Sequence, residues 1–249
     1  MPGATKPDTR VPRLVRAADG AAQAARLAAA IAVELNAALA RRAAASLVVS
    51  GGRTPAAMFA LLARQPLEWA RVQITLADER WVGADDPASN ETLVRNALLR
   101  EHAAAAQLIG MKNAAPTAAA GAAPAWRSIN AMPQPFDVVV LGMGDDGHTA
   151  SLFPDSVGLG SALDAAAAPA CVAMQPLAAP HARLSLNLAA LLRSRRICIQ
   201  ISGAGKWQVY QHALAAGPVE EMPVRAILRQ QAVPVDVYWC PDAPQAGKS

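Results

Sequence analysis

Residues 136–141 form a short, strongly apolar run that ends at Gly142, and this run constrains the fold more than any other segment. A strand without polar alternation is typical of a parallel sheet, because helices cover both faces of such a sheet and leave neither in water. The run therefore predicts a strand that is buried on both faces.

Helix-like and strand-like segments alternate along the rest of the chain. Leucine and isoleucine recur every four residues from Leu27 to Leu39, which predicts an amphipathic helix over residues 18–42. Further helices are predicted over 89–100 and 184–193 and from about Lys206, and further strands at 46–50, 72–77, 107–111, 196–202 and 235–240. Residues 114–124 are rich in alanine and proline and include Gly121, so we expect a loop there.

This order of elements predicts an α/β protein with a mostly parallel sheet, helices on both faces, and functional loops at the carboxyl ends of the strands. A chain of 249 residues is long enough for one such domain and, less comfortably, for two small ones. Because no segment resembles a linker, we expect a single domain over residues 13–242, with disordered tails at 1–12 and 243–249.

Neither secretion nor membrane insertion is expected. Residues 1–12 are polar and contain prolines, without the apolar core of a signal peptide. The longest apolar stretch, residues 21–40, is interrupted by Gln23, Arg26, Glu34 and Asn36 and is poorly suited to cross a bilayer. We therefore predict a cytoplasmic protein with no membrane partner.

Cysteine usage and charge narrow the function classes. The three cysteines are widely spaced and form no Cys-x-x-Cys pair, which disfavours disulfides and zinc fingers. The formal net charge is +4, but the lysines and arginines are scattered rather than gathered into a stripe with aromatic residues. We therefore expect no nucleic-acid partner, whereas a modest positive charge suits a small anionic substrate.

The first informative turn joins a predicted strand to a predicted helix and consists of Ser50, Gly51, Gly52, Arg53 and Thr54. Thr54 suits the N-cap of that helix, and Pro55 suits its first helical position. Free backbone N–H groups at a helix start attract anions, and glycines let a phosphate approach the backbone closely. An ordinary tight turn explains the two glycines equally well.

The second informative turn follows the predicted strand at 72–77 and carries three consecutive charged residues, Asp78, Glu79 and Arg80. A charge run on a helix is usually a solvated face. This run falls at the carboxyl end of a predicted strand, where functional residues concentrate, so we favour a role in a site.

The third informative turn follows residues 136–141 and satisfies the pattern Gly-x-Gly-x-x-Gly at Gly142, Gly144 and Gly147. That pattern raises the hypothesis of a dinucleotide site. However, adjacent Asp145 and Asp146 would repel a pyrophosphate, and no acidic residue stands at the end of a second strand about 20 residues further on. A dinucleotide site is therefore disfavoured.

His148 in the same turn is the better candidate for chemistry. It follows two carboxylates at the mouth of the predicted sheet, and Asp78 ends another strand of that sheet. An imidazole that titrates near neutral pH and is oriented by a carboxylate has the properties of a general base. We favour this role over that of a structural histidine.

Two cations could hold a phosphate. Arg183 precedes a predicted helix, and Lys206 follows a Gly-Ala-Gly turn after a predicted strand. Taken singly, each is more often a surface charge. The spacing around Lys206 does not match a P-loop, and no group of side chains has the spacing of a catalytic metal site.

Together, Ser50-Gly51-Gly52-Arg53-Thr54-Pro55, Asp78-Glu79-Arg80-Trp81-Val82, Ser89-Asn90 and the run from Gly142 to Pro154 resemble the 6-phosphogluconolactonase family. The resemblance covers about residues 26–206. It implies a modified doubly wound fold and hydrolysis of 6-phospho-D-glucono-1,5-lactone, without a metal or an organic cofactor. We expect a monomer or a weak homodimer.

The resemblance also implies a role for each matching position. It implies that the turn Ser50 to Thr54, Arg183 and Lys206 hold the phosphate and that Asn90 contacts the substrate. It implies that His148 activates water, that Asp78 and Asp146 orient groups or the histidine, and that Arg80 stabilises anionic character.

Two rival functions remain open. Glucosamine-6-phosphate deaminases share the fold, but they carry a glutamate five residues after the histidine, where this chain has Phe153. They also usually have a tyrosine after the Asp-Glu pair, where this chain has Arg80. The other rival is a sugar-phosphate-binding regulator that has lost turnover. An assay of lactone hydrolysis distinguishes this regulator from an active lactonase.

Overall fold

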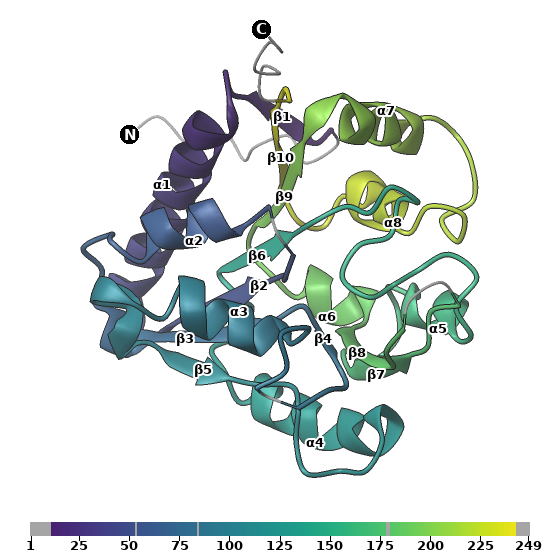
Figure 1. The fold of residues 1–249 in the computed structure, drawn as a ribbon, viewed down its shortest axis with the longest axis horizontal. Helices are drawn as coiled ribbons and strands as arrows, with labels where there is room; N and C mark the ends of the chain where they lie inside the picture. Colours follow the sequence, from purple (N-terminus) through teal and green to yellow (C-terminus); the bar gives the residue numbers. More distant parts are fainter. Residues whose placement is uncertain (1–10, 53, 84, 178–179, 243–249) are drawn as a thin grey trace, which may run out of the picture.

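The computed structural model describes residues 11–52, 54–83, 85–177 and 180–242 (Figure 1). Within these residues the central sheet has seven strands, all parallel, in the order β1-β10-β9-β6-β2-β3-β5. Their bounds are β1 (Arg13–Arg16), β2 (Ala45–Val49), β3 (Val72–Leu76), β5 (Gln107–Ile109), β6 (Val138–Leu141), β9 (Ile197–Ser202) and β10 (Val235–Cys240).

Helices lie on both sides of this sheet. Figure 1 shows α1 (Gly20–Leu39) on one side of β9 and β10, with α7 (Gly203–Leu214) and α8 (Val224–Arg229) on the other. The remaining helices are α2 (Ala56–Leu62), α3 (Asn90–Ala97), α4 (Ala118–Asn130), α5 (Leu159–Ala162) and α6 (Leu188–Leu192), with short 3-10 turns η1 (Trp69–Arg71) and η2 (Glu101–Ala105). The predicted α/β class with a mostly parallel, doubly wound sheet is confirmed.

Helix α1 is a few residues shorter at each end than the sequence predicts. It begins after Asp19, whose carboxylate accepts a hydrogen bond of 2.8 Å from the backbone N–H of Ala22. Leu27, Ile31 and Leu35 are buried, as their spacing predicts, and the helix packs against β2, β6 and β10. The helix thereby covers the middle of the central sheet.

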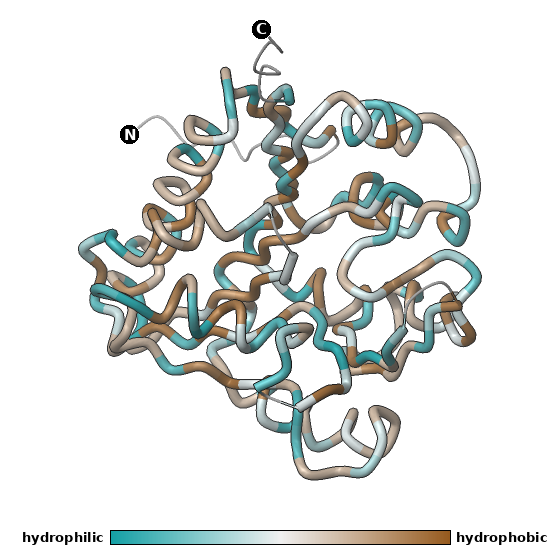
Figure 2. Tube along the Cα trace, viewed as in Figure 1, coloured by the Kyte–Doolittle hydropathy of each residue, from teal (hydrophilic) through white to brown (hydrophobic). Residues whose placement is uncertain are grey.

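The central strands are confirmed close to their predicted bounds. Every residue of β2 and β6 is buried, and Figure 2 shows these strands in the brown of apolar residues at the centre of the molecule. Burial on both faces accounts for the unbroken apolar run from which β6 was predicted.

A second, antiparallel sheet was missed by the sequence analysis. It consists of β4 (Asp78–Arg80), β8 (Arg183–Leu186) and β7 (Cys171–Met174). Its β4 was predicted as a turn, and its β8 as the start of a helix over 184–193. That helix, α6, begins only after Asn187, whose side chain caps it by accepting a hydrogen bond of 2.9 Å from Ala190 N–H. Pairing with the distant strand β4 on one side and with the preceding strand β7 on the other overrides the local helical pattern of β8.

The loop predicted at 114–124 is also wrong, because most of it belongs to helix α4. Thr117 caps the helix with a hydrogen bond of 3.2 Å from Ala120 N–H, and its buried residues Ala118, Gly121, Ala125 and Ile129 follow a helical spacing. Pro124 lies inside the helix. The cap, the alanines and the buried stripe together outweigh the one hydrogen bond that proline removes.

The start of α2 differs by one residue from the prediction. Pro55, rather than Thr54, is the N-cap, and its carbonyl accepts the hydrogen bond from Phe59 N–H at 2.8 Å. No side chain caps this helix. Thr54 therefore stays in the turn, where its side chain is free to serve the cavity described below.

None of the helices within the described ranges is both long and apolar enough to span a membrane. The predicted tails fall almost wholly on residues 1–10 and 243–249, which lie outside those ranges. At the carboxyl ends of β2, β6 and β9, three turns converge, and the antiparallel sheet stands beside them.

Candidate active site

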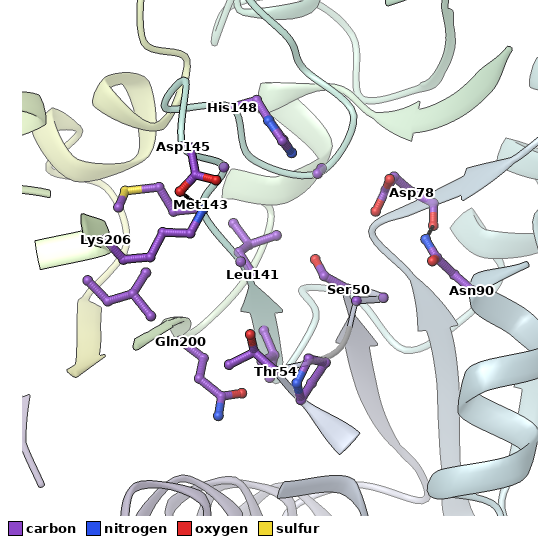
Figure 3. Close-up of a pocket in the computed structure, with 18 of the residues that line it drawn as sticks. Ser50, Thr54, Asp78, Asn90, Leu141, Met143, Asp145, His148, Gln200 and Lys206 are labelled. Atoms are coloured by element: carbon purple, nitrogen blue, oxygen red, sulfur yellow. Dashed lines mark hydrogen bonds and ion pairs between the residues drawn. The ribbon is translucent and has the colours of Figure 1, made fainter. Parts of the chain in front are cut away.

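A cavity of about 390 Å³ opens at the carboxyl ends of β2, β6 and β9 (Figure 3). It is closed on one side by α7 and on the other by α3 and the antiparallel sheet. Most of the predicted site residues line it, namely Ser50, Gly51, Gly52, Thr54, Asp78, Arg80, Asn90, His148, Arg183 and Lys206. Asp146 stands behind His148 rather than in the lining, and Arg53 lies outside the described residues.

His148 and Asp146 form a hydrogen-bonded pair. His148 Nδ1 lies 2.6 Å from Asp146 Oδ1, and the same carboxylate oxygen accepts the backbone N–H of His148 at 3.0 Å. Partial burial acts to raise the pKa of Asp146, but the hydrogen bonds from His148 outweigh it and leave the pKa below its ordinary value. A carboxylate in this position fixes the ring and favours a proton on Nδ1, which leaves Nε2 free to take another.

The turn between β6 and His148 is shaped by close backbone contacts. A Cβ on Gly144 would lie 2.0 Å from His148 Nδ1, and Gly147 adopts a positive φ of 79°. Gly144 N–H donates to the His148 carbonyl at 2.8 Å, and Thr149 Oγ1 donates to the Gly142 carbonyl at 2.9 Å. Gly-x-Gly-x-x-Gly therefore serves here to fold a loop tightly around a histidine.

An aromatic ring covers one face of that histidine. Phe153 stacks on His148 with ring centroids 3.9 Å apart and an angle of 29° between the ring planes. The guanidinium of Arg183 lies 5.2 Å from the centroid of the same ring. The position at which deaminases carry a glutamate thus holds an apolar ring in direct contact with the histidine.

Asp78 serves the opposite wall of the cavity rather than His148. Its Oδ2 accepts a hydrogen bond from Ser151 Oγ and lies 3.8 Å from Arg183 Nη1. Burial lowers the pKa of the Arg183 guanidinium, and the charge of Asp78 partly offsets this. Of the two aspartates that the sequence left open as partners of the histidine, Asp146 makes the contact.

Glu79 holds the start of α3 in place. Its carboxyl group is buried and accepts hydrogen bonds from the backbone N–H groups of Arg80, Asn90 and Glu91 and from Ser89 Oγ, at 2.7–2.9 Å. Burial raises the pKa of Glu79, and these hydrogen bonds counteract the rise. The charged run at 78–80 therefore combines a structural glutamate, Glu79, with two residues that line the cavity, Asp78 and Arg80.

Several polar atoms of the lining have no protein partner. Among the described residues, Ser50 Oγ, Asn90 Oδ1 and the Nε atoms of Arg80 and Arg183 are buried without a hydrogen bond. Asn90 is fixed by its Nδ2, which donates to the Asp78 carbonyl at 2.8 Å, and a Cβ on Gly51 would lie 1.8 Å from Asn90 Oδ1. Because unpaired buried polar groups are unfavourable, a polar ligand is the natural partner for these atoms.

Lys206 lies on the wall opposite Asp78 (Figure 3). Its Nζ is 2.8 Å from Asp145 Oδ1, so the loop that carries His148 is joined to the first turn of α7. Asp145, Ser151 and Phe153 were not among the predicted site residues. The signal for them was their position within the motif from Gly142 to Pro154, but a motif does not state which side chains it brings into contact. No group of three or more potential metal ligands occurs within the described ranges.

Known proteins share both the sequence and the fold. The model of the family described as "Glucosamine-6-phosphate isomerases/6-phosphogluconolactonase" matches residues 18–239. A 6-phosphogluconolactonase of Pseudomonas putida is 42% identical over 224 residues, which cover 90% of this chain and 91% of that protein. One from Pseudomonas aeruginosa is 44% identical over 221 residues, or 89% of this chain and 92% of that protein.

Solved structures agree with this similarity. The crystal structure of a 6-phosphogluconolactonase from Shewanella baltica has a TM-score of 0.90 and 47% identity, and the match covers 93% of this chain and 99% of that one. A monomeric glucosamine-6-phosphate deaminase has a TM-score of 0.74 at 17% identity, which shows a shared fold. The chain belongs to the glucosamine-6-phosphate isomerase/6-phosphogluconolactonase family.

Proposed function

We propose that this protein hydrolyses 6-phospho-D-glucono-1,5-lactone to 6-phospho-D-gluconate, the second step of the oxidative pentose phosphate pathway. The observation that carries the proposal is the His148–Asp146 pair at 2.6 Å, set at the edge of a cavity lined by Arg80, Arg183 and Lys206. A base beside three cations suits an anionic ester. The names of relatives at 42–44% identity support the same reaction.

His148 acts as the general base in this mechanism. Asp146 holds Nδ1, so Nε2 accepts a proton from a water molecule as its oxygen attacks the lactone carbonyl. The bond from carbonyl carbon to ring oxygen then breaks, and the proton passes from His148 to the departing ring oxygen. A general base supplies roughly 10²–10⁴-fold, and orientation of the bound substrate adds to this.

The phosphate is held by the turn from Ser50 to Thr54 together with Lys206, and Arg183 adds positive charge from the opposite wall. Support comes from the lining of the cavity, in which Ser50 Oγ is buried without a partner among the described residues and Lys206 lies in the first turn of α7. Asn90 Oδ1 is placed to accept a sugar hydroxyl, and Arg80 offers its unpaired Nε to an anionic oxygen. The substrate thus replaces contacts that the protein itself leaves unmade.

Phe153 favours the lactonase over the deaminase. In deaminases a glutamate five residues after the histidine assists opening of the sugar ring, but the side chain at that position here is a phenyl ring stacked on His148, which can transfer no proton. The other alternative, a regulator that binds sugar phosphates without turnover, has no need for a histidine with a carboxylate partner.

An assay of both substrates tests this function. The purified chain is incubated with 6-phosphogluconolactone and, separately, with glucosamine 6-phosphate, while acid release and ammonia release are followed. We expect hydrolysis of the lactone well above its spontaneous rate and no ammonia. Ammonia release would establish a deaminase instead, and a lactone rate equal to the spontaneous rate would establish a binding protein.

We further propose a cytoplasmic location and a monomer or weak homodimer, with no nucleic-acid or membrane partner. The scattered distribution of the positive charges supports the absence of a nucleic-acid partner. Sedimentation analysis over a range of protein concentrations tests the oligomeric state.

A further inference from the structure

Of the cations that line the cavity within the described ranges, Arg80, Arg183 and Lys206, the last two are already paired with carboxylates of the chain. Arg183 Nη1 lies 3.8 Å from Asp78 Oδ2, and Lys206 Nζ lies 2.8 Å from Asp145 Oδ1. Arg80 instead donates from Nη1 to the Ala88 carbonyl at 2.5 Å. An anionic ligand therefore meets a cavity in which two positive charges are partly neutralised.

The two ion pairs differ in their freedom to open. The side chains of Arg183 and Asp78 are only 10% and 7% exposed, and Asp78 is held further by Ser151. The side chain of Asp145 is 90% exposed, and among the described residues Lys206 is its single polar partner. An exposed carboxylate rotates into water at little cost, because exposed ion pairs contribute about 0.2–1 kcal/mol.

We propose that Asp145 is a displaceable counterion of Lys206, which the phosphate of the ligand must replace. In the free protein the Asp145 carboxylate forms an ion pair with the ammonium group of Lys206. When a phosphate arrives, Asp145 swings into water and Lys206 turns to the ligand, and the pair re-forms as the product leaves. The inference deepens the proposed function, since it rests on Lys206 as a phosphate-binding residue.

This competition has a purpose in a hydrolase whose product keeps the phosphate. Substrate and product share that group, so a strong unopposed cation would bind both and slow product release. A built-in competitor weakens the affinity for any phosphate-bearing molecule by the same factor, inorganic phosphate included. The ratio of their affinities is therefore unchanged, and the effect is faster release of the product and lower occupancy by inorganic phosphate rather than selection between ligands.

A double-mutant cycle on the binding of inorganic phosphate tests the proposal without using turnover. Binding is measured by calorimetry for the wild type, Asp145→Asn, Lys206→Ala and the double variant. We expect Asp145→Asn to tighten phosphate binding about two- to fivefold, which corresponds to an exposed ion pair. In the Lys206→Ala background the same change should give no gain, because nothing is left to compete for.

The matched control is Asp164→Asn, which removes an exposed carboxylate from the loop after α5, outside the cavity lining. It should leave phosphate binding unchanged. An equal gain from Asp164→Asn, or an equal gain from Asp145→Asn with and without Lys206, would show mere long-range repulsion and overturn the proposal. Weaker binding by Asp145→Asn would overturn it as well, since Asp145 would then position Lys206.

The same cycle separates this inference from the proposed function. If phosphate binding follows the expected pattern while the wild type fails to hydrolyse the lactone, the counterion stands and the lactonase does not. If the lactone is hydrolysed but Lys206→Ala leaves phosphate binding unchanged, the lactonase stands and the counterion is overturned.

Discussion

The two walls of the cavity hold their charged side chains in opposite ways. On one wall, His148, Lys206 and Asp145 come from loops and a helix start, and each side chain is at least a quarter exposed. On the other wall, Asp78 and Arg183 face each other from β4 and β8 and are almost fully buried. The groups to which we assign proton transfer and counterion exchange thus lie in contact with water, whereas the buried pair has the burial expected of a fixed frame.

The antiparallel sheet explains why the second wall is rigid. Its central strand β8 pairs with β4 and with β7, and Leu186 N–H also donates to the Ala77 carbonyl at 2.8 Å, just beyond β3. Arg183 therefore lies on a strand that is paired on both sides, and Asp78 lies on the edge strand β4, which is paired with β8. The contrast separates side chains on loops at the edge of the parallel sheet from side chains on strands of the antiparallel sheet.

Loss of the base on the exposed wall should have the largest effect. We expect His148→Ala to lower kcat for 6-phosphogluconolactone by about 10²–10⁴-fold with little change in KM, because the base acts in the transition state. The ring is partly exposed, so we expect a folded variant, which circular dichroism checks. Unchanged kcat would reject this role, and the two walls would then no longer differ in chemistry.

The buried pair should dominate stability. We expect Asp78→Asn to lower the free energy of unfolding by about 3–5 kcal/mol, because it leaves the buried guanidinium of Arg183 without its counterion. Asp145→Asn is the matched change in the exposed pair and should lower it by less than about 1 kcal/mol. Urea unfolding of both variants measures the difference, and similar losses from the two would break the distinction between a frame and a mobile wall.

Lys206 should matter only for a phosphorylated substrate. We expect Lys206→Ala to reduce kcat/KM for 6-phosphogluconolactone. The corresponding loss of transition-state stabilisation should be about 1.5–3 kcal/mol, the value of one charge-assisted contact. The unphosphorylated lactone should be a very poor substrate, and the variant should barely change its rate. Catalytic efficiencies of both proteins on both lactones give the comparison. Equal proportional losses would mean that Lys206 supports the fold or the chemistry, and its phosphate role would have to be withdrawn.

The sequence predicted site residues on both walls, but it predicted the secondary structure only of the exposed wall. His148 and Lys206 follow apolar strands of a parallel sheet, whose carboxyl ends meet at one edge whatever the details of packing. Arg183 belongs to a strand whose four residues are all buried and one of whose partners, β4, lies far away in the chain. A short strand that is buried on both faces shows no alternation of polar and apolar residues. Its local sequence pattern was therefore interpreted as the start of a helix.

Contacts between side chains were the other gap. The sequence brought Asp78 and Asp146 forward as partners of His148, and spacing could not choose between them. In the structure His148 is hydrogen-bonded to Asp146, two residues away, because the glycines at 144 and 147 let the loop fold back on itself. Phe153 was recognised only as a missing glutamate, since its stacking on His148 depends on the same turn.

The smallest effect concerns the Asp146 carboxylate. Hydrogen bonds from His148 lower its pKa in the folded state, although partial burial opposes them. A lowered pKa means that the folded protein favours the charged carboxylate. The stabilisation is therefore fully present above the unfolded pKa, which is about 3.9 for aspartate, and is lost as the pH falls through the folded pKa.

Asp146→Asn isolates this contribution, because asparagine can still accept the hydrogen bonds from His148 but carries no charge. Since the carboxylate is about half exposed (48%), solvent screens it, and we expect a loss of less than about 1 kcal/mol in the free energy of unfolding at pH 6. The difference between wild type and variant should shrink as the pH is lowered below about 4. Urea unfolding at a series of pH values measures it. A difference that grows toward low pH would mean that the folded state favours the protonated acid, and Asp146 would then belong with the buried, frame-forming groups rather than with the exposed wall.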